Sequence, residues 1–176
     1  MPRFADCGAG RPMPRSSPDY RDRPVSFPGV YDIRSGSRSG RFGAFDLDPC
    51  ASVNRPWNIA AHHYTVEDDG LKLPWHDRVF CNLPYDKALI NQFIQRCTDH
   101  RNAIALTFVR TDTKLFQELI FPRADSILFI KGRVSFYHVT GMQGGPEGAP
   151  SCLIAFDRHN TEMLEQIGIE GCLVRL

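Results

Sequence analysis

The chain has 176 residues, of which 42% are hydrophobic and 23% charged, a balance typical of a globular domain and unlike a disordered or fibrous chain. Lys plus Arg total 21 and Asp plus Glu total 20, so no overall excess of charge draws the protein toward a polyanion or a membrane surface. No apolar run reaches the ~18 residues of a membrane-spanning helix and no signal peptide is visible, so we expect a soluble, cytoplasmic protein.

The first 40 residues include six Pro, five Gly and six Ser, together with seven Arg and four Asp. This composition, with little apolar periodicity, predicts a flexible arm over residues 1–41. Alternatively, the arginines of the arm neutralise the phosphates of a nucleic acid. A short apolar cluster within residues 25–33 could still pack against the domain that follows, which we expect to span residues 42–176.

From residue 42 onward, short apolar runs alternate with stretches of helical spacing, which predicts an α/β domain. Strands are expected at residues 45–47, near 64–66, and at 78–81, 103–109, 127–131, 134–137, 152–155 and 172–175. Helices are expected at residues 54–62, 86–99, 113–120 and 160–167. Because helix-length segments join most early strands, a mainly parallel sheet is favoured there. The later runs around Gly132 and the Gly- and Pro-rich loop 141–150 indicate antiparallel strands at one edge.

Polar residues follow three of the early apolar runs, in the segments FDLDPCAS, TVEDDGL and VFCNLPYD. Ligands of open α/β sheets bind beyond the carboxyl ends of the strands, so these segments would converge on one crevice. Carboxylates there can accept hydrogen bonds from a ribose or an adenine amine, which suits a nucleoside-containing cofactor. The alternative is that Asp46, Asp48 and Asp69 only cap helices or turns, and that Asn82 and Pro84 only end a strand.

Other residue patterns carry weaker signals. We interpret His62 and His63 as ordinary histidines at a helix end and not as a metal site. We expect Trp57 and Trp75 to pack in the core and not to stack on bases. None of the six cysteines lies at CxxC spacing, so we interpret them as reduced thiols and expect no metal. A further set of basic residues could form a local basic face that contacts phosphates, or could simply be solvated surface charge: Arg110, Lys114, Arg123, Lys131 and Arg133.

The series FDLDPCAS, DGLKLPW, VFCNLPY, VRTDTKLFQEL, FPRADSILFIKGRVSFY and APSCLIAF, over about residues 42–157, resembles the phage-type DNA N-6-adenine methyltransferase (phage Dam) family. The resemblance implies a Rossmann-like class I fold, S-adenosylmethionine as cofactor, no metal, and methylation of the exocyclic amine of adenine. It implies double-stranded DNA as the partner of a monomer or weak dimer, in a bacterial or phage-infected cell. DNA modification or protection from restriction would be its role.

The same resemblance assigns roles to individual residues. Asn82, Leu83, Pro84 and Tyr85 stand in the place of the family's Asn-Pro-Pro-Tyr motif. The Asn82 side-chain oxygen and the Leu83 carbonyl would accept hydrogen bonds from the adenine amine, and Tyr85 would stack on a base swung out of the duplex. The cofactor would be bound by two carboxylates and the small residues beside them: Asp48, Pro49, Cys50, Ala51, Asp69 and Gly70.

Leu83 stands where the motif has its first proline. Proline fixes φ near −65°, so leucine is expected to weaken the pre-organisation of this segment. If that weakening limits turnover, Leu83→Pro should raise it.

Two other functions stay open. One is a catalytically degenerate relative that still binds DNA, which would bind cofactor without methylating. The other is a methyltransferase for a different amine or amide, such as an RNA adenine or a protein glutamine, because a site of this type suits any flat amide-like nitrogen.

Overall fold

The computed structural model describes residues 25–27, 31–32, 43–53, 58–84, 86–137, 143–146 and 149–176. Within these ranges, no helix has both the length and the apolar character needed to cross a membrane.

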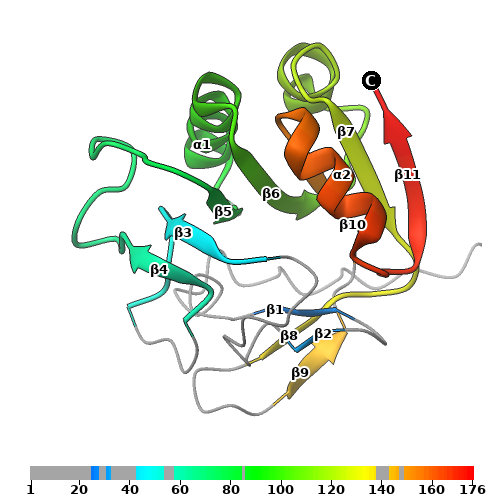
Figure 1. Cartoon of the computed structure of the whole chain (residues 1–176), viewed down its shortest axis with the longest axis horizontal. Coiled ribbons are helices and arrows are strands. Elements are labelled where there is room, and N and C mark those ends of the chain that lie inside the picture. Colours follow the sequence, from blue (N-terminus) through cyan, green and yellow to red (C-terminus); the bar gives the residue numbers. More distant parts are fainter. Residues whose placement is uncertain are drawn as a thin grey trace, which may run out of the picture.

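Seven strands form a central sheet in the order β11-β7-β10-β6-β5-β3-β4 (Figure 1). Their bounds are β3 Phe45–Asp48, β4 Ala60–His63, β5 Val79–Asn82, β6 Ala103–Phe108, β7 Ser126–Ile130, β10 Ser151–Ala155 and β11 Gly171–Arg175. Strands β4, β3, β5 and β6 are parallel, whereas β10 is antiparallel to both β6 and β7, and β11 is antiparallel to β7. The prediction of an α/β fold whose parallel sheet has an antiparallel edge is confirmed.

A smaller antiparallel sheet has the order β2-β1-β8-β9, and Figure 1 shows it beneath the central sheet, away from α1. Its strands are β1 Val25–Phe27, β2 Tyr31–Asp32, β8 Ser135–Tyr137 and β9 Gln143–Pro146. The chain leaves β7 through Gly132, whose φ of 86° is readily adopted only by glycine, and so β8 departs from the edge of the central sheet where we expected it. Strands β1 and β2 come from the predicted arm, of which residues 1–24, 28–30 and 33–41 lie outside the described ranges.

Two α-helices connect strands of the central sheet. Helix α1 (Lys87–His100) joins β5 to β6, and the side chain of its N-cap Asp86 accepts hydrogen bonds from two backbone N–H groups of the first turn. Helix α2 (Arg158–Gln166) joins β10 to β11, and the side chain of its N-cap Asp157 accepts a hydrogen bond from the backbone N–H of Asn160. A π-helical segment, η3 (Leu115–Ile120), follows β6. Three of the four expected helices are therefore confirmed, although η3 is a π-helix and not an α-helix.

The fourth expected helix, over residues 54–62, is wrong. Ala60–His63 forms β4, which pairs in parallel with β3, and the strand expected near residues 64–66 is displaced by a few positions. The exposed edge of β3 offers unpaired backbone groups, and pairing with them outweighs the local spacing of apolar residues. His62 and His63 consequently lie on an edge strand and not at a helix end. Residues 54–57, which include Trp57, lie outside the described ranges.

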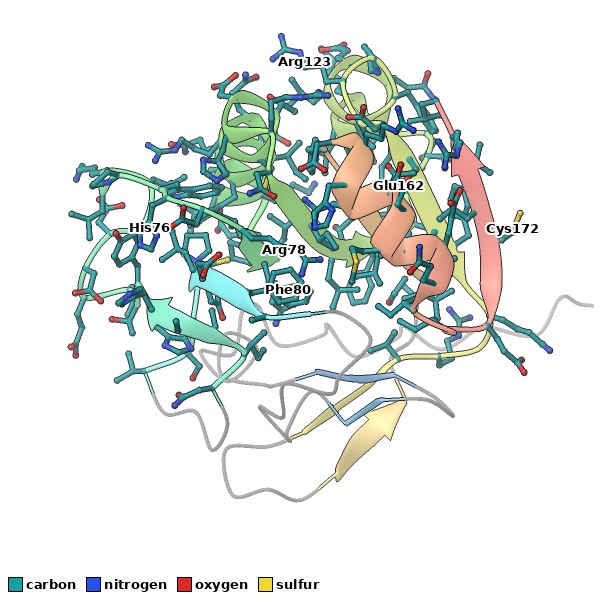
Figure 2. The ribbon with its side chains drawn as sticks, in the orientation of Figure 1. His76, Arg78, Phe80, Arg123, Glu162 and Cys172 are labelled. Atoms are coloured by element: carbon teal, nitrogen blue, oxygen red, sulfur yellow. The ribbon has the colours of Figure 1, made fainter. Side chains whose placement is uncertain are left out.

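The central strands are buried on both faces, which explains their nearly continuous apolar sequence. In β5, Phe80 packs into the core cluster that contains Leu164 of α2, whereas Val79 and Cys81 pack into the cluster that contains Ile94 of α1. Alternate side chains of a strand point to opposite faces, so the two helices cover opposite faces of the sheet. Figure 2 shows Phe80 in the interior of the molecule, next to the buried Arg78.

Candidate active site

The order of the strands places a topological switch point between β3 and β5. Strand β4, which follows β3 in sequence, pairs with one edge of β3, and the next strand, β5, pairs with the other edge. The order of the strands along the chain therefore changes direction between β3 and β5. Ligands of open α/β sheets bind at this kind of switch point, outside the carboxyl ends of the strands. Asp48 ends β3 and Asn82 ends β5, so two residues predicted from the sequence lie at the carboxyl ends of adjacent parallel strands.

The loop after β3 holds Asp48 in place. The side chain of Asp48 is only 4% exposed, and its Oδ1 accepts a hydrogen bond of 3.1 Å from the backbone N–H of Cys50. Backbone hydrogen bonds of 2.9 Å join the Asp48 carbonyl to the N–H of Tyr64, and the N–H of Ala51 to the Tyr64 carbonyl. Pro49 and Ala51 are buried as well. The residues predicted to line a cofactor site therefore form a loop fixed at both ends.

Gly70 brings the second acidic segment against this loop. A Cβ atom at Gly70 would lie 1.9 Å from the carbonyl oxygen of Pro49, so only glycine permits this approach of two backbones. The Gly70 carbonyl also accepts a hydrogen bond of 2.7 Å from the indole nitrogen of Trp75. The segments around Asp48 and Asp69, far apart in sequence, are thus in direct contact.

Asp69 itself is arranged differently from Asp48. Its backbone φ is 58°, its side chain is 43% exposed, and its Oδ2 lies 2.7 Å from Nζ of Lys72. The hydrogen bond with Lys72 lowers the pKa of the Asp69 carboxyl group. The structure therefore places an ionised carboxylate at the surface beside Gly70, paired with a lysine.

Arg96 of α1 is a residue of this region that the sequence did not reveal. Its two terminal nitrogens donate hydrogen bonds of 2.8 Å to the carbonyls of Leu71 and Leu73, and its guanidinium lies 5.0 Å from the centre of the Trp75 ring. Trp75 in turn stacks on Phe93 of α1, with 6.3 Å between ring centres. These contacts confirm the packing role expected of Trp75, and they fasten the segment after Gly70 to α1.

Asn82 carries an acceptor that the protein leaves unused. Within the described part of the chain, its Oδ1 is buried and has no hydrogen-bond partner. A buried polar atom without a partner costs about 1–3 kcal/mol, and such atoms are uncommon in folded proteins. The arrangement is accounted for if this oxygen receives a donor from a bound molecule.

The residues after Asn82 continue the motif. Leu83 is 2% exposed, and its backbone N–H donates a hydrogen bond of 3.3 Å to the carbonyl of Leu106 on β6. Proline could not make this bond, because it has no N–H. Pro84 is half-buried, and Tyr85 lies outside the described residues, so its stacking role stays a prediction.

Buried thiols lie directly beneath the motif. Sγ of Cys50 lies 3.2 Å from Sγ of Cys81 and 3.1 Å from the carbonyl oxygen of Asn82. Burial raises the pKa of both thiols, so neither has the thiolate character of a nucleophile. Among the residues with described positions, no group of three or more His, Cys, Asp or Glu is arranged to hold a metal ion.

The expected basic residues divide between the two edges of the sheet. Arg110 and Lys114 follow β6 and Arg133 follows β7, so all three are exposed at the edge that carries Asp48 and Asn82. Lys131, which is paired with Glu170 at 2.8 Å, also follows β7. Arg123 instead precedes β7, and Figure 2 shows it at the opposite end of the molecule, so it is not part of a common basic face.

One comparison with known proteins gives a match. A family model described as DNA N-6-adenine-methyltransferase (Dam) matches residues 36–168, which is well over half of the chain. No curated protein and no solved structure matches the chain. The matched range includes Asp48, Gly70 and Asn82, the three residues around which the site is built.

Proposed function

This chain belongs to the DNA N-6-adenine-methyltransferase (Dam) family, and from that premise we propose that it transfers a methyl group from S-adenosylmethionine to the exocyclic amine of adenine in double-stranded DNA. The observation that carries the proposal is the buried Oδ1 of Asn82 at the switch point of the sheet, which has no hydrogen-bond partner among the residues that the structure describes. Parallel strands on either side of this point also support a Rossmann-like class I fold.

The chemistry requires acceptors of the kind that Asn82 offers. The lone pair of the adenine amine is delocalised into the ring, so this nitrogen is a poor nucleophile. Hydrogen bonds from its two protons to the Asn82 Oδ1 and the Leu83 carbonyl favour a pyramidal nitrogen whose lone pair can attack. Orientation of the amine supplies most of the remaining acceleration, so no strong general base is needed.

The residues around Asp48 and Gly70 fit S-adenosylmethionine. The buried Asp48 carboxylate can accept hydrogen bonds from hydroxyl or amine protons. Gly70 has no side chain, so its segment can lie directly against the backbone of Pro49. When bound, the cofactor supplies an electrophilic methyl group on its sulfonium. Asp48, Pro49, Cys50, Ala51, Asp69 and Gly70 would hold it beside Asn82.

The family implies DNA as the substrate. We expect the protein to contact it at the edge of the sheet where β3 and β5 end. A base must leave the duplex to reach Asn82, because a stacked base cannot present its amine. Arg110, Lys114 and Arg133 are exposed at this edge and suit contacts with phosphates, which fix the position of a duplex without reading its sequence.

The proposal is tested by incubating the purified protein with tritiated S-adenosylmethionine and unmethylated double-stranded DNA. We expect the label in N6-methyladenine after digestion of the DNA to nucleosides. Duplex already methylated at adenine N6 is the matched control, and RNA and bulk protein are parallel substrates. Label in RNA or protein alone would identify the alternative methyltransferases. Retention of cofactor without transfer would identify a degenerate DNA-binding relative.

A pair of substitutions tests the role of Asp69. We expect Asp69→Ala to weaken cofactor binding several-fold, because an acceptor beside Gly70 is lost. Lys72→Ala breaks the same ion pair but leaves the carboxylate, so it should preserve or improve affinity. Isothermal titration calorimetry measures both. Equal loss of affinity in the two variants would return Asp69 to a purely local role in its turn.

Substitution of Leu83 tests what the missing proline costs. We expect Leu83→Pro to bring no gain in turnover and to lower stability by about 1 kcal/mol, because it removes the hydrogen bond to the Leu106 carbonyl. Leu83→Met keeps the N–H and most of the buried volume, so it is the matched control. Chemical denaturation and steady-state kinetics check the two effects. Faster methylation by Leu83→Pro would show that loss of the fixed φ is the stronger effect.

A further inference from the structure

The thiol of Cys50 lies between the segments that end β3 and β5. Its Sγ is 3.1 Å from the carbonyl oxygen of Asn82 and donates a hydrogen bond to it. Its backbone N–H donates to Oδ1 of Asp48 at 3.1 Å. Cys50 therefore contacts one residue on each side of the switch point, through its side chain on one side and its backbone on the other.

This thiol remains protonated. Burial is the main reason that the pKa of Cys50 is raised, and the nearby Asp48 carboxylate adds to it. The pKa of the neighbouring Cys81 thiol is raised for the same main reason. An S–H group in these surroundings is a hydrogen-bond donor at neutral pH and an unreactive nucleophile.

The carbonyl that receives this hydrogen bond belongs to the peptide group between Asn82 and Leu83. The N–H of the same peptide group donates to the carbonyl of Leu106 at 3.3 Å. A peptide group is planar, so one bond at its oxygen and one at its nitrogen fix the orientation of the whole plane. That plane fixes the Cα of Asn82, from which the side chain extends, and the Cα of Leu83, from which the backbone continues to the Leu83 carbonyl.

We propose that Cys50 is a positioning residue for methyl transfer, whose thiol holds the Asn82–Leu83 peptide group so that both acceptors face the adenine amine. The proposal rests on the function proposed above. It also gives the motif a restraint where leucine stands in place of proline: the peptide plane before Leu83 is held by a hydrogen bond at its oxygen and another at its nitrogen.

Three variants test the proposal. Cys50→Ala removes the donor, Cys50→Ser restores one, and Cys152→Ala removes a buried thiol on β10, which β6 separates from β5. Cys50→Ala keeps the backbone N–H that contacts Asp48, and with it the loop that would hold the cofactor. We therefore expect it to lower kcat about tenfold while the KM for DNA and the cofactor Kd stay within about twofold. Cys50→Ser should recover kcat to within about threefold of the wild type, and Cys152→Ala should retain it.

Two kinetic results would overturn the proposal: equal losses of kcat in Cys50→Ala and Cys152→Ala, or no recovery in Cys50→Ser. If the wild-type protein transfers no methyl group, the proposed function itself fails, and infrared spectroscopy then tests the contact separately. A hydrogen-bonded Cys50 thiol should show an S–H stretching band at lowered frequency that disappears in Cys50→Ala. A band at the frequency of a free thiol would show that the contact with Asn82 is absent.

Discussion

Asn82→Ala should lower kcat for adenine methylation by about 10²–10³, the usual effect of removing one hydrogen-bonding group that acts on the transition state. The variant deletes the buried Oδ1 that has no partner within the described chain. Because this oxygen is expected to contact the amine and not the cofactor, cofactor affinity should change by no more than about threefold. Single-turnover methylation and calorimetry measure the two quantities.

The stability of the same variant gives an independent check. Removing a buried acceptor without a partner relieves its desolvation cost, so the melting temperature of Asn82→Ala should be unchanged or higher. Asn91→Ala, at an exposed position of α1, is the control for an asparagine outside the site and should leave turnover unchanged. Wild-type turnover in Asn82→Ala would remove Asn82 from the reaction. A large drop in melting temperature would show that its side chain stabilises the fold.

Gly70→Ala should weaken cofactor binding at least about tenfold. A Cβ at this position would lie 1.9 Å from the Pro49 carbonyl oxygen, and the atom it meets is backbone, which cannot swing aside. The loop between Asp48 and Ala51 must then move away from the segment at Asp69, which separates the two halves of the site. Overpacking of this kind also destabilises a protein, typically by about 1–3 kcal/mol.

Gly171→Ala separates the local effect from the general one. Its Cβ would lie 2.2 Å from the Phe129 carbonyl oxygen, so it creates the same kind of backbone clash, but on β11 at the far edge of the sheet. Both variants should have a lower melting temperature than the wild type. In calorimetry at a temperature below both melting temperatures, only Gly70→Ala should show weaker cofactor binding. Equal losses of affinity would mean that Gly70 acts through overall stability alone.

The sequence predicted the site best where a strand ends in a polar residue. Asp48 and Asn82 follow apolar runs that form β3 and β5, and the parallel pairing of these strands brings their ends together. The prediction was wrong at β4, whose residues have the spacing of a helix. Ala60 pairs with Phe45 across the sheet, and this pairing depends on a neighbour that the local sequence does not contain.

Two contacts of the site were beyond prediction for the same reason. Arg96 holds Leu71 across 25 positions of the chain, and Cys50 holds Asn82 across 32. Neither arginine in a helix nor cysteine in a loop has a sequence pattern that marks such a partner. The fit of Gly70 against Pro49 likewise depends on how two loops meet.

The small sheet has a consequence for the order in which the protein forms. Its strand β1 pairs Val25 with Phe136, more than 100 positions later, whereas β3 and β5 of the central sheet are joined through a much shorter stretch of chain. Closing so long a loop carries a large entropic cost and slows folding, and during synthesis the partner of β1 emerges only after β7. The strands that carry Asp48 and Asn82 can therefore assemble while the start of the chain still waits for its partner.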